Sequence, residues 1–162
     1  MLRPKGLAGF TLIELMVTIV VLVILISVAA PSFTSTLRDS QVATTSGELQ
    51  TALQLARSEA VMRHNRVTVC RRNAAGDDCE NGTDWSTGWL LRQSGGDIIK
   101  VWQAPSDVAI VGPNSGVTYQ GNGMVSTATS LSVSQSSCSG KQKRTISVAL
   151  SGLTKIEKAD CQ

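Results

Sequence analysis

Few residues of this sequence have the type and spacing needed for chemistry. The 162-residue chain has one histidine, His64, and it lacks the nucleophile motifs of hydrolytic enzymes. The acidic segment at residues 77–82 faintly resembles a calcium loop. However, Cys79 occupies the third position and Gly88 the twelfth, where calcium needs oxygen ligands. The sequence therefore predicts neither an enzyme nor a bound metal or other cofactor.

The second candidates for chemistry are the four cysteines, Cys70, Cys79, Cys138 and Cys161. They can pair in three ways, and sequence alone does not choose among these. Pairs Cys70–Cys79 and Cys138–Cys161 are favoured because each closes a local loop. A structural zinc site favours about two to four residues between paired ligands, whereas eight separate Cys70 from Cys79. Disulfides indicate an oxidising compartment beyond the inner membrane.

Basic residues gather near the C-terminal end. They are Lys141, Lys143, Arg144, Lys155 and Lys158. A Cys138–Cys161 bond would place them in one tethered loop, which could hold phosphates by charge and with strong salt sensitivity. The net charge of +3 gives no basic field over the whole molecule, so a solvated basic edge is the alternative.

One acidic residue lies within a hydrophobic segment. Nineteen of the 24 residues from Leu7 to Ala30 are hydrophobic, and Glu14 is the only acid among the first 38 residues. Residues 10–30 would form a helix about 31 Å long, enough to cross a bilayer. Arg3 and Lys5 precede it and should stay in the cytoplasm. A carboxylate inside a membrane costs about 3 kcal/mol on insertion scales, so Glu14 needs a partner.

Three interpretations of this segment compete. A cleavable secretory signal usually has a hydrophobic run of about 7–15 residues, shorter than this one, and no acid within it. A plain membrane anchor explains the length but not Glu14. Cleavage between Gly9 and Phe10 would create an α-amino group four residues before Glu14, on the same helical face. In an array of such helices, Glu14 of one subunit could neutralise the amine of its neighbour.

The segment Gly-Phe-Thr-Leu-Ile-Glu at residues 9–14 resembles the type III signal of type IV pilins and type II secretion pseudopilins. The short basic leader, residues 1–9, and the positions of Gly9, Phe10, Glu14 and Pro31 all match the family's spacing. The resemblance implies cleavage at Gly9–Phe10 and methylation of Phe10 by a prepilin peptidase, followed by filament assembly. It also implies a single membrane pass with a periplasmic head, and a later location in the pilus at the cell surface.

The remaining chain must position these residues. Pro31 should kink the helix, and apolar spacing at Leu49, Leu53, Ala56 and Ala60 predicts an amphipathic half over residues 31–64. Residues 44–47 are weak helix formers and mark a second soft spot. After residue 65 the period changes to two, and Gly, Asn, Pro and Ser separate the segments. Strands are expected at 67–69, 89–91, 98–102, 108–111, 116–119, 131–133, 145–150 and 153–158.

These elements predict an α+β protein, with a long N-terminal hydrophobic helix packed on a C-terminal antiparallel sheet. The resemblance identifies this arrangement with the pilin fold. Its parts are the leader, an assembly half at 10–30, the amphipathic half at 31–64 and a β-rich periplasmic head at 65–162.

Two stretches of the sequence point to one subgroup of the pilin and pseudopilin family. Residues 49–69, with the pattern LQxARSEAVxRxxxVxV, and the W-x-x-G-W element at 85–89 are similar to FimT and FimU minor pilins and H-type pseudopilins. Cysteines around the C-terminal region favour a pilus component over a secretion pseudopilin. Some FimT-type pilins bind DNA through a C-terminal Gly-Arg-x-Arg motif. The nearest matches here, residues 140–143 and 152–155, lack the arginines.

The expected function is that of a minor type IV pilin, placed in a tip or priming complex of the pilus. The implied partners are other minor pilins, the major pilin, the prepilin peptidase, the inner membrane and the pilus assembly platform. The alternatives are a DNA-binding minor pilin for natural transformation and an H-type pseudopilin of type II secretion.

Overall fold

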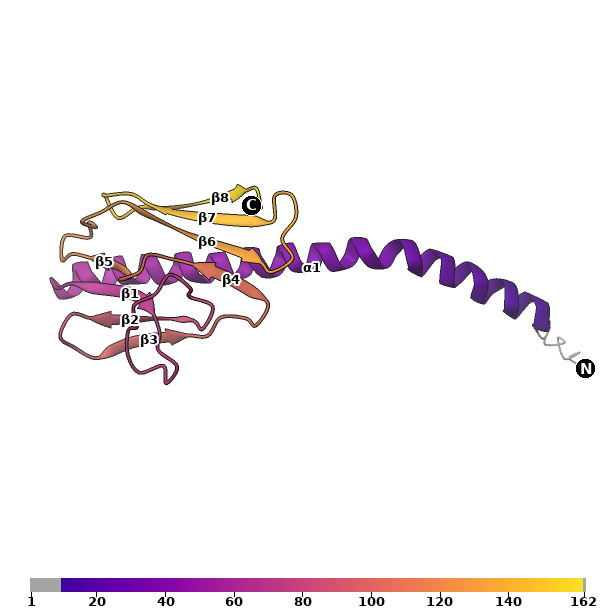
Figure 1. Cartoon of the computed structure of the whole chain (residues 1–162), viewed down its shortest axis with the longest axis horizontal. Helices are drawn as coiled ribbons and strands as arrows, with labels where there is room; N and C mark the ends of the chain where they lie inside the picture. The colour runs from indigo at the N-terminus through magenta and orange to yellow at the C-terminus, as the bar shows by residue number, and fades with distance from the viewer. Residues whose placement is uncertain (1–9, 162) are drawn as a thin grey trace, which may run out of the picture. The chain divides into compact units, whose positions relative to one another are not determined.

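The computed structural model describes residues 10–161, and it describes residues 28–32 by their backbone alone. The chain divides into two units, residues 1–37 and 38–162, and one helix, α1 (Leu12–Arg63), contributes to both (Figure 1). Gly9 and the rest of the expected leader lie outside the described residues. We call the second unit the head.

Helix α1 begins and ends at local signals in the sequence. The Thr11 hydroxyl accepts a hydrogen bond from the Glu14 backbone N–H at 3.3 Å, which is the geometry of an N-cap. At the other end, His64 has a φ of 50°, a left-handed conformation that stops a helix. The predicted end near residue 64 is therefore confirmed.

The two predicted soft spots lie inside this helix. Pro31 is helical in its backbone, but its side chain lies outside the described part, so the kink stays a prediction. Thr45 and Ser46 are buried, and their hydroxyls donate to helix carbonyls four residues earlier, at 2.9 and 2.7 Å. A Cβ on Gly47 would meet no atom within 4 Å, so packing does not require glycine there.

All eight expected strands occur, with ends shifted by up to two residues. One sheet has the order β3-β2-β1-β5, formed by β1 (Val67–Arg71), β2 (Trp89–Gln93), β3 (Ile98–Trp102) and β5 (Val117–Tyr119). The other has the order β4-β6-β7-β8, formed by β4 (Val108–Val111), β6 (Thr129–Gln135), β7 (Lys143–Val148) and β8 (Thr154–Ala159). The pairings within both sheets are antiparallel, which confirms the α+β fold class.

The expectation of one sheet needs correction, because the strands divide into two. Period-two spacing predicts a strand and its buried face but contains no information on which strands are neighbours. Strands β4 and β5 are consecutive in sequence yet belong to different sheets. An isolated bridge between Asp84 and Val111 reaches β4 from the loop before β2.

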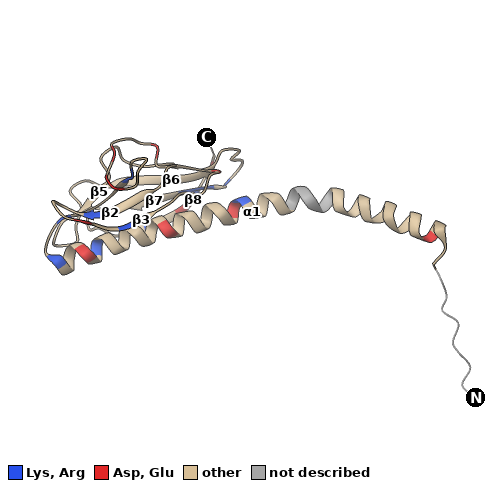
Figure 2. Cartoon of the chain, turned by 90° about the horizontal axis from the view of Figure 1, so that it is seen from below, with Lys and Arg blue, Asp and Glu red and all other residues tan. Residues whose placement is uncertain are grey.

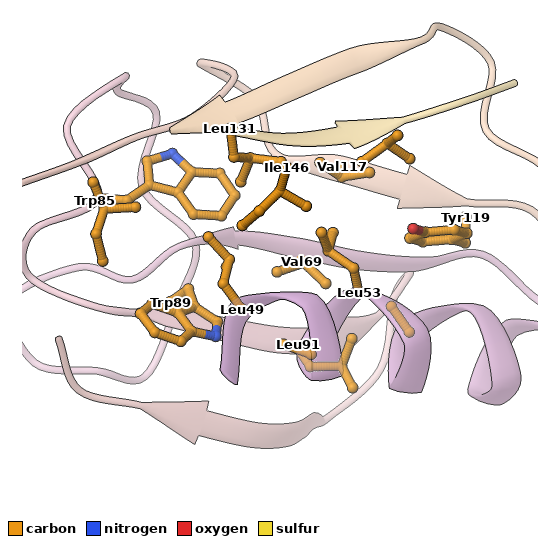
Figure 3. Packing of buried hydrophobic residues seen from close by; sticks show 14 of the residues in the cluster. Leu49, Leu53, Val69, Trp85, Trp89, Leu91, Val117, Tyr119, Leu131 and Ile146 are labelled. Atoms are coloured by element: carbon orange, nitrogen blue, oxygen red, sulfur yellow. The ribbon is translucent and has the colours of Figure 1, made fainter. Parts of the chain in front are cut away.

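Both sheets pack on α1 through one hydrophobic core (Figure 3). The predicted helix stripe at Leu49, Leu53, Ala56 and Ala60 is fully buried. In strands β6 and β7, alternate residues are buried, as expected for sheets with one covered face. Trp85 and Trp89 are also fully buried, which places the W-x-x-G-W element inside the head.

Disulfides join Cys70 to Cys79 and Cys138 to Cys161, with a Cα–Cα distance of 5.7 Å in each pair. These are the two local pairings that the sequence favours. The first bond ties the loop after β1 back to that strand. The second ties the loop before β7 to the chain after β8, so each disulfide fixes a connection rather than the core.

Candidate functional site

The first candidate site is the start of α1, where Phe10 and Glu14 lie. Phe10 is 80% exposed and precedes the helix. The Thr11 carbonyl accepts the Leu15 N–H at 3.2 Å, and the Thr11 hydroxyl accepts the Glu14 N–H. Thr-x-x-Glu at a helix start has the residue pattern of a capping box. The sequence itself contains this capping signal at residues 11–14. The expected role of Glu14 took into account only its pairing with an amine.

The position of Thr11 changes the predicted geometry of Phe10 and Glu14. Because α1 begins at Leu12, Phe10 lies outside the helix, and the two residues do not share a helical face. Glu14 lies in the first turn, where the helix dipole favours a negative group. Among the described residues, its carboxylate forms no ion pair. A further positive partner therefore has to come from outside the described chain.

The apolar side chains that follow Glu14 are exposed on every side of the helix. From Leu12 to Ile26, the large hydrophobic residues have exposed fractions between 50% and 76%. Phe33 and Leu37 are also exposed, at 66% and 53%. A contiguous apolar surface of this extent marks a site of contact with another protein or with lipid.

In the part of the chain that the structure describes, no helix combines the length and the apolar character needed to cross a membrane.

The second candidate site, the C-terminal basic cluster, is divided by the fold. Arg144 is 6% exposed, and its Nη2 donates to Asp39 Oδ1 at 2.6 Å. Its Nη1 donates to the carbonyl of Lys141 at 3.2 Å. Arg144 therefore joins β7 to α1 and presents no surface for a phosphate, contrary to the DNA-binding role considered above. Asp39, the first acid after Glu14, was not recognised as its partner.

The lysines of this cluster lie on different faces and at different ends of the sheet. Lys155 pairs with Glu157 at 2.7 Å, near the start of β8. Lys158 lies near the end of β8, opposite Arg144 in register and 3.9 Å from Asp39. Residues 155 and 158 point to opposite faces, since their spacing is odd. The predicted single patch of five cations is not present.

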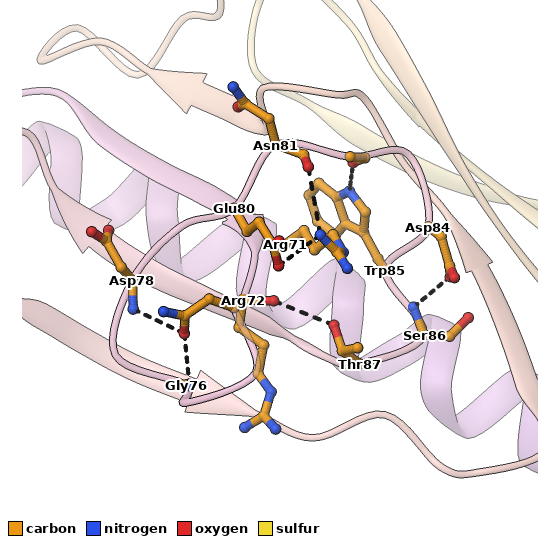
Figure 4. Close-up of polar contacts among 12 residues, drawn as sticks. Arg71, Arg72, Gly76, Asp78, Glu80, Asn81, Asp84, Trp85, Ser86 and Thr87 are labelled. Carbon is orange, nitrogen blue, oxygen red and sulfur yellow. Dashed lines mark hydrogen bonds and ion pairs between the residues drawn. The ribbon is translucent and has the colours of Figure 1, made fainter.

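Acidic residues of the loop after β1 pair with arginines of β1 and β2. Glu80 pairs with Arg71 at 2.8 Å (Figure 4), and Asp78 pairs with Arg92. Hydrogen bonds from Ser86 hold the pKa of the Asp84 carboxyl below its ordinary value. Within the described residues, no group of His, Cys, Asp or Glu is arranged to hold a metal. The loop is thus a structural feature of the head.

Both the N-terminal segment and the head match models of known protein families. Residues 5–30 match the prokaryotic N-terminal methylation motif, and residues 45–152 match the type II transport protein GspH. The second match covers most of the head and more than half of the chain. The chain belongs to the GspH family. This is a family of pilins and pseudopilins, which are structural proteins.

Solved structures of two proteins have a fold similar to that of this GspH-family chain. Two crystal forms of the type IV minor pilin FimU from Pseudomonas aeruginosa match with TM-scores of 0.57 and 0.59 at 19% identity. They cover 71% and 73% of this chain and 91% and 89% of FimU. The minor pseudopilin EpsH of the Vibrio cholerae type 2 secretion system matches with a TM-score of 0.50 at 12% identity. It covers 73% of this chain and 97% of EpsH. No curated protein matches the chain.

Proposed function

We propose that this GspH-family chain is a minor pilin of a type IV pilus, which acts by assembly and not by catalysis. The observation that carries the proposal is the exposed apolar helix that directly follows Phe10, within residues that match the methylation motif. An apolar surface of this extent is unfavourable in water and has to be buried against another molecule. Lipid buries it before assembly, and the helices of neighbouring subunits bury it in the filament.

The proposed maturation begins at the leader. A prepilin peptidase cleaves between Gly9 and Phe10 and methylates the new amine of Phe10. Residues 10–30 then hold the chain in the inner membrane by a single pass, with the head in the periplasm. Two disulfides in the head are consistent with that oxidising compartment. Extraction by the assembly platform places the subunit beside the major pilin and other minor pilins, in a tip or priming complex.

Glu14 has the central role in the proposed packing. A carboxylate among apolar helices is costly unless a positive group neutralises it. The Thr11 cap leaves Phe10 outside the helix, so the methylated amine of one subunit can approach Glu14 of the next. The pairing is therefore between subunits, with each carboxylate matched to a neighbour's amine.

Substitution of Glu14 by Gln tests this pairing. The Gln side chain keeps the size and the polar reach toward the cap but removes the charge. We expect cleavage at Gly9–Phe10 to continue, because the leader is unchanged, while the amount of subunit in sheared pili falls at least tenfold. Immunoblots of the membrane and pilus fractions measure both quantities.

The matched control is Glu48→Gln, which removes an exposed acid from the head part of α1. This variant should enter pili at the wild-type level. Normal incorporation of Glu14→Gln would contradict the pairing, and a loss in both variants would point to a general effect of helix charge.

The pseudopilin alternative rests on the GspH family model itself and on the fold likeness to EpsH. A deletion strain separates the two functions. Loss of surface pili with unchanged protein secretion supports the minor pilin, whereas loss of secretion with normal pili supports the pseudopilin. DNA capture has less support than either, because Arg144 is buried and the lysines are divided.

A further inference from the structure

Four cations lie at the end of the head where α1 enters it, and the first of them is Arg38 of α1. Lys141 lies in the loop before β7, Lys143 begins β7, and Lys158 lies near the end of β8. These three connections are held together, because Cys138 is bonded to Cys161 and the Cys161 N–H donates to the Gly140 carbonyl at 2.9 Å. Figure 2 shows basic positions on this part of the head. Lys143 and Lys158 belong to opposite faces of this sheet, at the same end of it. We call Arg38, Lys141, Lys143 and Lys158, which together surround this end, the entry ring.

The ring is tied to the helix entry by buried contacts. Arg144 joins Asp39 of α1 to the carbonyl of Lys141, and Lys158 lies 3.9 Å from Asp39. The Gln135 amide donates to the Gln41 side chain at 2.8 Å, which links β6 to the same turn of α1. These contacts thus hold the backbone of the loop before β7 and of the end of β8 against α1.

The ring carries more positive charge than its neighbours neutralise. The buried guanidinium of Arg144 balances the carboxylate of Asp39. Asp107, which directly precedes β4, and Asp160 are two further acids at this end of the head, so the four ring cations have a local excess of two positive charges over these acids. The Lys158 side chain is 62% exposed, and Arg38 and Lys141 are also exposed. Such a cluster attracts a polyanionic surface.

We propose that the entry ring binds the phosphate groups of anionic phospholipids while the chain is anchored in the membrane, before it assembles into a filament. This inference rests on the proposed anchoring by residues 10–30. The backbone is helical from Leu12 to Arg63, and Arg38 lies eight residues after Ala30, about 12 Å along the helix axis. The headgroup layer adds roughly 5–8 Å to each side of the hydrocarbon core, and long basic side chains reach back to it. The short connection from residue 30 to Arg38 therefore limits how far the ring can lie from the phosphate layer.

The same residues argue for lipid over DNA. A DNA site was expected to include Arg144 and Lys155, yet Arg144 is buried and Lys155 pairs with Glu157 near the other end of β8. Lys141 and Lys158 are exposed and lie at the end of the head where α1 enters it. Before assembly, that is where membrane phosphates are present at high local concentration.

Lysine footprinting of the full chain in nanodiscs tests the proposal. The discs contain either phosphatidylcholine alone or phosphatidylcholine with phosphatidylglycerol. An acylating reagent labels accessible lysine side chains, through the small fraction present as the neutral amine, for mass spectrometry. We expect labelling of Lys141 and Lys158 to fall about fivefold in the anionic discs at low salt. Lys100 in β3 and Lys155 serve as internal references and should not change. About 1 M salt should remove the protection.

A pair of double variants provides the matched control. Lys141→Gln with Lys158→Gln should abolish the protection of Lys143, whereas Lys100→Gln with Lys155→Gln should preserve it. Equal labelling of the ring in both kinds of disc would overturn the lipid contact alone. Protection by duplex DNA on phosphatidylcholine discs, without protection by anionic lipid, would overturn it in favour of nucleic acid. A chain that fails to co-purify with discs would overturn the anchoring and this inference together.

Discussion

The two units of the chain differ in how far they bury the same types of residue. Between Leu12 and Ile26, leucine, isoleucine and valine are at least half exposed, whereas Leu53 and Ile146 of the head are fully buried. The charges differ as well. Glu14 has no ion pair among the described residues, while Asp39 pairs with a buried arginine. The head thus buries its large core side chains and pairs Asp39 internally, whereas the N-terminal unit exposes apolar side chains and an acid that other molecules must cover.

This difference assigns the stability of the folded chain to the head and its assembly with other molecules to the N-terminal unit. A substitution in the buried core of the head should change the free energy of unfolding, whereas one in the N-terminal unit should change only association. All three tryptophans lie in the head, so their fluorescence reports on its unfolding in detergent-solubilised full chain. The predictions below test this division, in order of decreasing effect.

Truncation of one leucine in each unit gives the largest contrast. Leu53→Ala should lower the free energy of unfolding of the head by about 2–5 kcal/mol, because Leu53 is fully buried against both sheets. Leu22→Ala should change it by less than about 0.5 kcal/mol, since Leu22 is 56% exposed. Denaturant titrations followed by tryptophan fluorescence measure both. An equal loss in the two variants would remove the distinction between the units.

Tyr119 should make the head sensitive to alkali. Burial raises the pKa of its hydroxyl to about 12, although the positive charge of Arg57 lowers it in part. Between the ordinary pKa, 10.0, and about 12, the unfolded chain ionises Tyr119 while the folded head does not. Stability should therefore fall by roughly 2 kcal/mol across this interval.

The comparison for this prediction is Tyr119→Phe, in which that part of the alkaline loss should disappear. The Tyr119 hydroxyl has no hydrogen-bond partner among the described residues, so the variant should be nearly as stable as the wild type at neutral pH. Tyr119 is the only tyrosine, and tyrosinate absorbance gives its titration directly. A midpoint near 10 in the folded chain would contradict this account.

Removal of the Asp39 charge should have a smaller effect. Asp39→Asn leaves Arg144 without its carboxylate, and we expect a loss of about 1–2 kcal/mol, less than for a fully buried pair because Asp39 is 36% exposed. Hydrogen exchange should rise mainly in the α1 amides near residues 38–47. The reference is Glu48→Gln, which should change neither quantity. Unaltered exchange in Asp39→Asn would show that the ion pair does not hold the helix entry.

The smallest expected effect is a gain. Gly47→Ala should stabilise the head by about 0.5–1 kcal/mol, because alanine favours the helix and a Cβ at this position meets no atom within 4 Å. Gly112→Ala is the informative counterpart, since its Cβ would lie 2.6 Å from the Trp85 ring and should destabilise the head. A loss of stability in Gly47→Ala would indicate that the α1 backbone needs glycine at this point.

Much of the fold followed from periodicity and much of the N-terminal site from spacing. The helix stripe from Leu49 to Ala60 and the eight strands were predictable, because burial on one face leaves a pattern in the sequence. The division into two sheets was not, since neighbouring strands are chosen by three-dimensional packing. The burial of Arg144 could not be predicted for the same reason. Its partner Asp39 lies 105 positions earlier. The Thr11 cap was readable from local sequence alone.

The central claim is that residues 10–37 remain on the mature subunit and pack against other subunits. Mass spectrometry of the N-terminal peptide from sheared, purified filaments tests it most directly. The account predicts a peptide that begins at Phe10 with one added methyl group and includes Glu14. A chain in the filament that begins after Ala29, as a secretory signal would leave it, would contradict the account, as would a chain that retains Gly9.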